Sequence, residues 1–110
     1  MSEVQVQVQE QIVNWEVNFI AMDTPTLFAN RLVVRCLDGS AEVSTLDANL
    51  IRGNGIYPLH IYCPDGVGVE AKIETIDCYG GNCSYKVSIW KDANLVRECA
   101  LDRNNPSCTA

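Results

Sequence analysis

The chain has 110 residues, with 8 basic and 14 acidic side chains, a formal net charge of −6 and 47% hydrophobic residues. This length fits a single domain, residues 1–110, with a modest core. The Lys and Arg residues are scattered singly, which excludes the basic cluster that nucleic acids or anionic membranes require. No stretch approaches the roughly 20 apolar residues that a membrane span needs.

The chain contains six cysteines at irregular spacing and one histidine. An even cysteine count in a small β-rich chain predicts a disulfide framework and a secreted protein, and reduced, buried cysteines in a cytoplasmic protein are the alternative. The first residues lack the features of a signal peptide. Secretion therefore implies that a leader has been removed and that Met1 is not native. No Cys-x-x-Cys occurs, so we expect no metal and no cofactor.

Alternation of apolar and polar residues begins at the N-terminus. Residues 4–9 alternate valine with glutamine, and residues 13–19 place Trp15 among apolar positions that we expect to face the core. The apolar parity changes between the two segments, which predicts a bulge or bend near residues 10–12. An open edge at residues 4–9 could mediate homodimerisation by strand addition, with pairing inside the monomer's own sheet as the alternative.

Asp38-Gly39 is a strong hairpin signal between strands at residues 31–37 and 40–46. A two-residue turn there fixes the register. The predicted pairs are Cys36 with Ala41, Arg35 with Glu42, and Val34 with Val43.

After a loop at residues 52–55, residues 56–63 form a strand that Pro58 restricts to an edge or a bulge. A three-residue loop with Gly66 in the left-handed conformation then predicts a hairpin with residues 67–76. Its register places Ile61 opposite Val69 and His60 opposite Glu70.

Cys78-Tyr79-Gly80-Gly81-Asn82-Cys83 is typical of a hairpin tip. The two glycines supply a turn, Tyr79 faces Asn82, and Cys78 lies opposite Cys83 at a distance that a disulfide can bridge. Two further strands follow at residues 84–91 and 95–101, and we expect an irregular tail at residues 102–110. The tail predicts a Cys99–Cys108 disulfide, which leaves Cys36 to pair with Cys63.

These elements predict an all-β fold, an antiparallel β-sandwich or flattened barrel of about eight strands stabilised by disulfides. A short helix fits only at residues 24–30 or 46–51.

Catalytic chemistry has little support in this chain. His60 is the only histidine, so a Ser–His or Cys–His mechanism would have to use it, and no nucleophile elbow accompanies it. Paired carboxylates could hydrolyse glycosides, but Glu70, Glu74 and Asp77 fall on alternate strand positions that we expect to be solvated. We therefore predict that the protein is not an enzyme.

We expect binding residues among the amphipathic aromatic side chains and in the loops. The candidates are Tyr57, Tyr62, Tyr79 and Trp90, with the loop residues Arg52, Gly80, Gly81 and Asn82. They predict a protein or glycan target.

Three features of the chain are also found together in one class of small proteins. They are Trp15-Glu16-Val17-Asn18-Phe19 on an early strand, Cys36 at the end of the next long strand, and Tyr62-Cys63 at the end of another. In these points the chain resembles small secreted fungal β proteins of the allergen and elicitor type. The density of cysteines, the acidic charge and the lack of a catalytic constellation predict a small secreted recognition protein without enzymatic activity, such as an effector, elicitor or toxin-like factor. The alternatives are a lectin-like carbohydrate-binding module and a hydrolase inhibitor.

Overall fold

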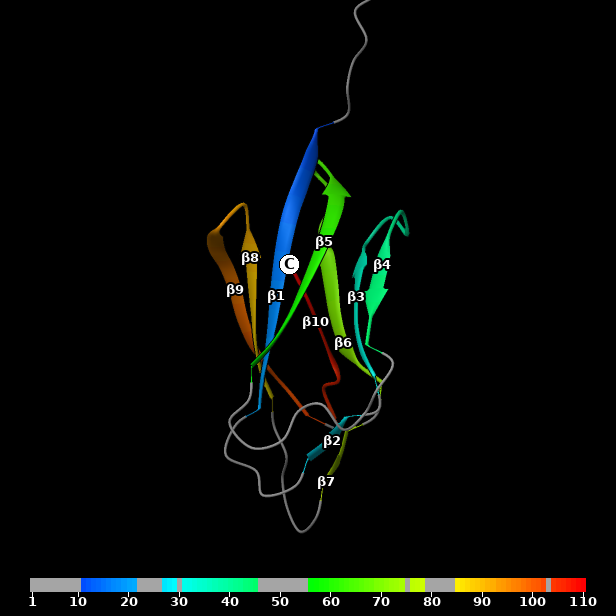
Figure 1. The fold of residues 1–110 in the computed structure, drawn as a ribbon, viewed down its shortest axis with the longest axis vertical. Coiled ribbons are helices and arrows are strands. Elements are labelled where there is room, and N and C mark those ends of the chain that lie inside the picture. Colours follow the sequence, from blue (N-terminus) through cyan, green and yellow to red (C-terminus); the bar gives the residue numbers. More distant parts are fainter. Residues whose placement is uncertain are drawn as a thin grey trace, which may run out of the picture.

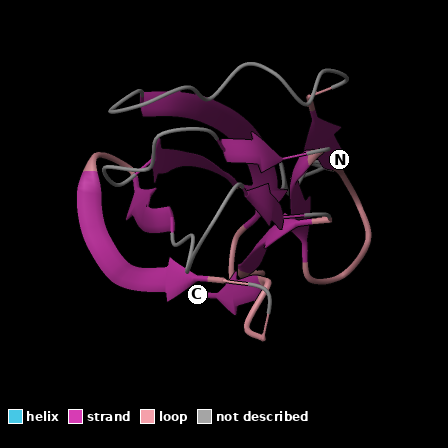
Figure 2. Cartoon of the chain, turned by 90° about the horizontal axis from the view of Figure 1, so that it is seen from below, coloured by secondary structure: helices cyan, strands magenta, loops and turns pink. Residues whose placement is uncertain are grey.

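The computed structural model describes residues 11–21, 27–29, 31–45, 56–74, 76–78, 85–102 and 104–110. Within these ranges the regular structure consists of β-strands (Figures 1 and 2). The strands are β1 (Ile12–Ala21), β2 (Leu27–Ala29), β3 (Leu32–Cys36), β4 (Glu42–Ser44), β5 (Ile56–Pro64), β6 (Val69–Ile73), β7 (Ile76–Cys78), β8 (Tyr85–Lys91), β9 (Asn94–Leu101) and β10 (Ser107–Thr109).

Two four-stranded antiparallel sheets pack face to face. One has the strand order β5-β1-β8-β9 and the other β10-β6-β3-β4, while β2 and β7 form a small separate pair (Figure 1). The predicted disulfide-stabilised, all-β sandwich is confirmed.

The core lies between the two sheets and is built by alternation along each strand. In β1, Trp15, Val17 and Phe19 point inward, and Trp15 keeps only 4% of its surface exposed. Val34 of β3 and Ile89 of β8 are fully buried in the same cluster. Because strand side chains alternate in direction, the intervening residues of β1 face away from the core.

Two disulfides join the sheets. Cys36 of β3 bonds to Cys63 of β5, with the Cα atoms 5.7 Å apart, and Cys99 of β9 bonds to Cys108 of β10, with the Cα atoms 6.6 Å apart. Both are pairings that the sequence predicts. The tip that would carry the predicted Cys78–Cys83 bond includes residues 79–84, which lie outside the described residues.

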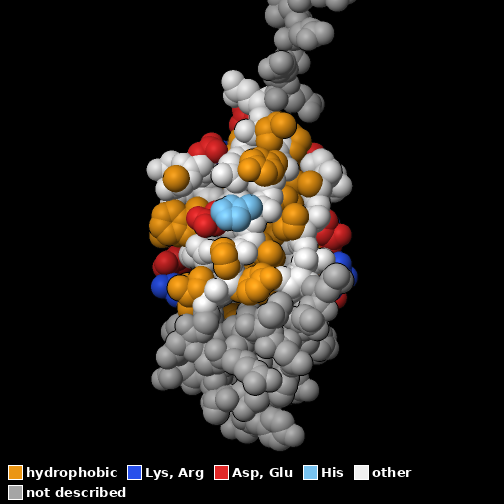
Figure 3. All heavy atoms as spheres, in the orientation of Figure 1, with side chains coloured by type: hydrophobic (Ala, Val, Ile, Leu, Met, Phe, Trp, Pro, Cys, Tyr) orange, Lys and Arg blue, Asp and Glu red, His pale blue; other side chains and the backbone are white. Residues whose placement is uncertain are grey.

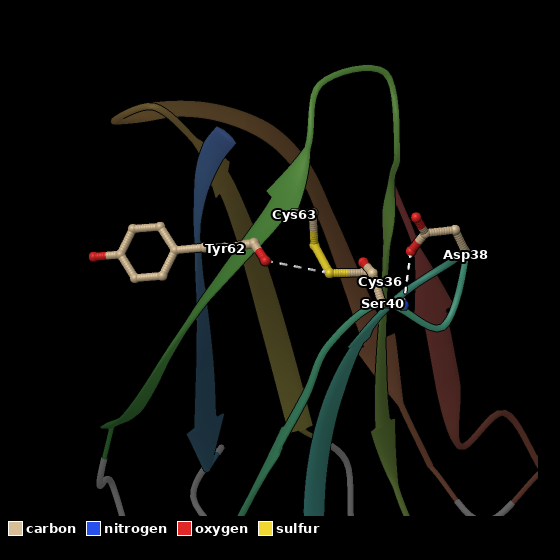
Figure 4. The surroundings of a disulfide bond; sticks show 5 residues. All are labelled: Cys36, Asp38, Ser40, Tyr62 and Cys63. Carbon is tan, nitrogen blue, oxygen red and sulfur yellow. Dashed lines mark hydrogen bonds between the residues drawn. A yellow bond between two sulfur atoms is a disulfide. The ribbon is translucent and has the colours of Figure 1, made fainter. Parts of the chain in front are cut away.

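Figure 4 shows the surroundings of the Cys36–Cys63 bond. The Cys36 sulfur lies 3.5 Å from the carbonyl oxygen of Tyr62. Because an oxidised sulfur carries no proton to donate, this is a close contact rather than a hydrogen bond. It places the backbone beside Tyr62 directly against the cross-link.

The β3–β4 hairpin has the predicted register, with Val34 opposite Val43 and Arg35 opposite Glu42. The backbone N–H of Gly39 donates to the carbonyl of Cys36 over 2.9 Å, and Gly39 has a φ of +79°. The turn is therefore centred one residue earlier than Asp38-Gly39, without any change in strand register. Asp38 supports it by accepting a hydrogen bond from the Ser40 N–H at 2.9 Å.

The predicted hairpin between residues 56–63 and 67–76 is wrong. β5 pairs with β1, whereas β6 pairs with β3 and β10, so the intervening residues cross from one sheet to the other. Gly66 has the predicted left-handed conformation, with a φ of +81°. A turn with a left-handed glycine can connect two strands of one sheet or two strands of facing sheets. The residues that point into the core alternate along the strands in the same way in the two cases.

Two consequences follow for residues that the sequence analysis paired. His60 lies opposite Glu16 of β1 rather than Glu70. Glu70 lies opposite Arg35, and their side chains form a 2.9 Å ion pair.

The C-terminal segment is more regular than predicted. Residues 107–109 form β10, which pairs with β6, and Ala110 exchanges backbone hydrogen bonds with Val69. Gly68 permits this approach, because a Cβ atom there would collide with the carbonyl oxygen of Ala110.

The remaining predictions from the sequence concern β5, the two segments where a helix could fit, the N-terminal alternation and one loop. β5 is an edge strand, as Pro58 predicts. Residues 27–29 form β2, so a helix over 24–30 is wrong at those positions. The alternation at residues 4–9, the possible helix at 46–51 and the loop at 52–55 lie outside the described residues.

We expect the two disulfides to stabilise the fold unequally. They close loops with sequence separations of 27 and 9 residues, which predicts losses of roughly 3–4 and roughly 2–3 kcal/mol when each is removed. The measurement is urea unfolding of Cys36→Ala/Cys63→Ala and Cys99→Ala/Cys108→Ala, with the exposed Ser107→Ala as control. Wild-type stability in either double variant would contradict this expectation.

Candidate functional site

The outer face of the β5-β1-β8-β9 sheet is the candidate functional site. No other described strand packs on this face. Figure 3 views it directly and shows the histidine beside an acidic side chain, with hydrophobic side chains around them. The face consists of the outward residues that alternate with the buried positions of the core.

The central row of this face crosses all four strands. Glu16 of β1 lies opposite both His60 of β5 and Trp90 of β8, and Trp90 lies opposite Leu95 of β9. The His60 Nε2 atom lies 3.7 Å from Glu16 Oε1, and both side chains are partly exposed. A carboxylate thus occupies the middle of the row, with a ring on each side.

The neighbouring rows continue the same arrangement. Asn14 pairs with Tyr62, which is 63% exposed, and Asn18 lies between Pro58 and Ser88. Along β1 the central outward residues are therefore amide, carboxylate and amide, at alternate positions, with Ile12 and Ile20 beyond them at the two ends. We call Asn14, Glu16 and Asn18 the polar ladder.

Trp90 has a defined orientation on this face. Its indole Nε1 donates a hydrogen bond to the hydroxyl of Ser88 over 3.2 Å, and Ser88 keeps only 6% of its surface exposed. The indole therefore leans along β8 over Ser88. A ring that is already fixed loses less conformational entropy when a ligand covers it.

The β8–β9 turn ties this part of the face to β1. Asp92 and Ala93 both have positive φ angles, of 46° and 66°. The Asp92 N–H donates to the carbonyl of Asn14 over 2.9 Å, and the Asn14 N–H donates to the Asp92 carboxylate over 3.3 Å. Together with the register shift between Ile89 and Trp90, this turn positions Trp90 and Leu95 beside the polar ladder.

The structure brings together two of the sequence-predicted binding residues, Tyr62 and Trp90. Tyr57 does not join them, because odd-numbered residues of β5 point inward and Tyr57 packs against the core. The candidates Arg52, Tyr79, Gly80, Gly81 and Asn82 lie outside the described residues.

Sequence reasoning did not select the polar ladder as part of a site. Its signal was present, since Asn14, Glu16 and Asn18 alternate with Val13, Trp15, Val17 and Phe19. What was missing was the pairing of β1 with both β5 and β8, which places the ladder between aromatic residues.

Burial and hydrogen bonding shift the pKa values of one residue in the core and two residues of the other sheet and its hairpin turn. Burial raises the pKa of the Tyr85 phenol well above its ordinary value, so Tyr85 stays neutral. The hydrogen bond and charge of Glu70 raise the pKa of Arg35, and hydrogen bonds from Ser40 lower the pKa of Asp38. The central rows of the candidate face offer ring surfaces, two amides, one imidazole and one carboxylate.

The described part of the chain has no cluster of three or more His, Cys, Asp or Glu side chains that could hold a metal ion. It also has no helix long and apolar enough to cross a membrane.

Comparisons of the chain with protein-family models, curated proteins and solved structures found no match. The resemblance to fungal allergen and elicitor proteins therefore stays a prediction.

We expect Ala93→Gly to stabilise the protein by about 1 kcal/mol, because glycine adopts a φ near +66° without the steric cost that alanine bears. The measurement is the free energy of unfolding in urea. Ala100→Gly in β9 is the matched control, and it should lose stability because glycine weakens a strand interior. A destabilised Ala93→Gly variant would contradict the assigned turn conformation.

Proposed function

We propose that the protein is a secreted recognition module without enzymatic activity, and that it binds its target through the outer face of β5-β1-β8-β9. The observation that carries this proposal is the placement of Tyr62 and Trp90 on either side of the polar ladder, on a sheet face that no other described strand covers. Large rings beside hydrogen-bonding groups supply both contact area and orientation to a ligand.

The sheet supports recognition because it is a rigid platform. Its inner residues are buried in the core, and both of its edge strands are cross-linked to the opposite sheet. A site on rigid strands needs little ordering when a ligand binds.

The disulfides support the extracytoplasmic part of the proposal. Disulfides persist in oxidising compartments and are rare in reducing ones. Two such bonds in a chain of this size are compatible with an extracellular location.

The finer biological roles are predictions from the sequence. An effector, elicitor or toxin-like factor would use the face to engage a host or competitor target. No contact in the described part of the chain favours a hydrolase inhibitor over these roles.

The test is binding of the labelled, disulfide-bonded protein to an array of extracellular proteins and glycans. We expect at least one class of probe to bind, and Tyr62→Ala/Trp90→Ala to weaken that binding at least tenfold, because a few aromatic residues commonly carry most of the binding energy of an interface. Lys72→Ala, an exposed substitution on the other sheet, is the matched control. Full binding by the double variant with an unchanged unfolding midpoint would overturn the proposed site.

A further inference from the structure

The distribution of polarity on the outer face of β5-β1-β8-β9 narrows the class of ligand. Its polar groups lie at the centre, its rings lie at the flanks, and the exposed side chains of Ile12 and Ile56 lie at the two ends. A typical protein–protein interface has the opposite arrangement, with an apolar centre and a polar rim. A protein partner would bury Glu16 in the middle of the contact, and an uncompensated buried charge is costly.

The polar ladder offers hydrogen bonds over a distance along β1. Outward residues on one strand repeat about every 7 Å, so Asn14, Glu16 and Asn18 form a line of three groups. The two amides both donate and accept, while the carboxylate accepts only. His60 adds a ring nitrogen 3.7 Å from the Glu16 carboxylate. Such a line matches a ligand with many hydroxyl groups, each able to donate and accept.

The rings lie on strands at either side of this line. Neighbouring strands are about 4.8 Å apart, so Tyr62 on β5 and Trp90 on β8 are carried by strands roughly 10 Å from each other. Since β1 lies between them, the two rings do not form the walls of one narrow cage. They offer two separate stacking surfaces beside a common polar line.

We propose that this face binds a neutral glycan chain, with sugar rings stacked on Tyr62 and Trp90 and sugar hydroxyls bonded to Asn14, Glu16 and Asn18. The inference rests on the proposed function and names the ligand class of that same face. The apolar C–H faces of a pyranose suit the aromatic rings. A sugar hydroxyl donating to Glu16 satisfies the carboxylate with a strong, charge-assisted hydrogen bond.

The charge of the molecule argues for a neutral ligand. The chain carries a net charge of −6, and the face itself includes Glu16 and Glu98. The basic groups beside them are few, and Lys86 is already paired with Glu98 at 3.3 Å. An acidic polysaccharide or a nucleic acid would be repelled by this distribution.

Because the face of a sheet is flat, we expect the binding affinity to depend on the length of the glycan. A single sugar can cover only one ring, whereas an oligosaccharide can reach both rings and the polar ladder in one binding event. We therefore expect a tetrasaccharide or longer chain to bind at least tenfold more tightly than the matching monosaccharide.

The experiment titrates the intact, disulfide-bonded protein with neutral oligosaccharides of glucose, N-acetylglucosamine, mannose and xylose. Acidic oligosaccharides and immobilised extracellular proteins are tested in parallel. We expect Trp90→Ala and Tyr62→Ala each to weaken binding of the preferred neutral chain at least tenfold. Glu16→Gln should weaken it severalfold, because the charge-assisted bonds are lost while the shape is kept.

Two further variants serve as controls for the role of the rings. Trp90→Phe keeps a stacking ring and should retain part of the affinity, and Lys72→Ala should retain all of it. Each variant's unfolding midpoint is measured, so that lost binding is not confused with lost structure.

The outcomes separate this inference from the proposed function. Binding to a protein or an acidic glycan alone, lost in Trp90→Ala, would overturn the neutral-glycan inference and leave recognition by this face standing. Neutral-glycan binding that survives Trp90→Ala and Tyr62→Ala would overturn the assignment of this face. Absence of binding to every probe would overturn both the inference and the proposed function.

Discussion

The sandwich depends on covalent links between its two sheets at opposite sides. Cys36–Cys63 joins β5, one edge of the first sheet, to β3, and Cys99–Cys108 joins β9, the other edge, to β10. A domain of this size has a thin core, and cross-links lower the entropy of its unfolded chain. Because the inner faces and the disulfides hold the fold, the outer face of the first sheet is free to carry side chains that add little to stability.

β1 connects that stability to the candidate site. Its odd-numbered residues from Val13 to Phe19 fill the core, while Asn14, Glu16 and Asn18 between them form the polar ladder. A slip of one residue would exchange the two sets, burying amides and a carboxylate and exposing the aromatic core. The register is therefore strongly determined, and the paired backbone bonds between Asn14 and Asp92 hold β1 against the β8–β9 turn. The register of β1, which the burial of its apolar residues determines, therefore also determines the positions of Asn14, Glu16 and Asn18 on the outer face.

Local patterns in the sequence were sufficient for some parts of this structure and insufficient for others. The β3–β4 register followed from Asp38-Gly39, because a short turn leaves few ways to pair the flanking strands. The β5–β6 connection did not, since Ile61 and Val69 point inward whether their strands pair in one sheet or face each other across two. The correct answer depended on which strand competes best for β5, and that is a long-range property. The polar ladder could not be predicted for the same reason, because only the long-range pairing of β1 with β5 and β8 places it between aromatic rings.

The composition of the polar ladder is difficult to explain by stability alone. Asparagine, and to a lesser degree glutamate, are disfavoured in strands, yet they occupy the three central outward positions of β1, which is flanked by a strand on each side. Threonine or valine would suit a sheet face that served only to be solvated or packed. Natural chains depart from local preference chiefly where a site requires it. The concentration of these departures on one face, and the regular alternation of the buried face beneath it, support the proposal that the outer face is the binding face.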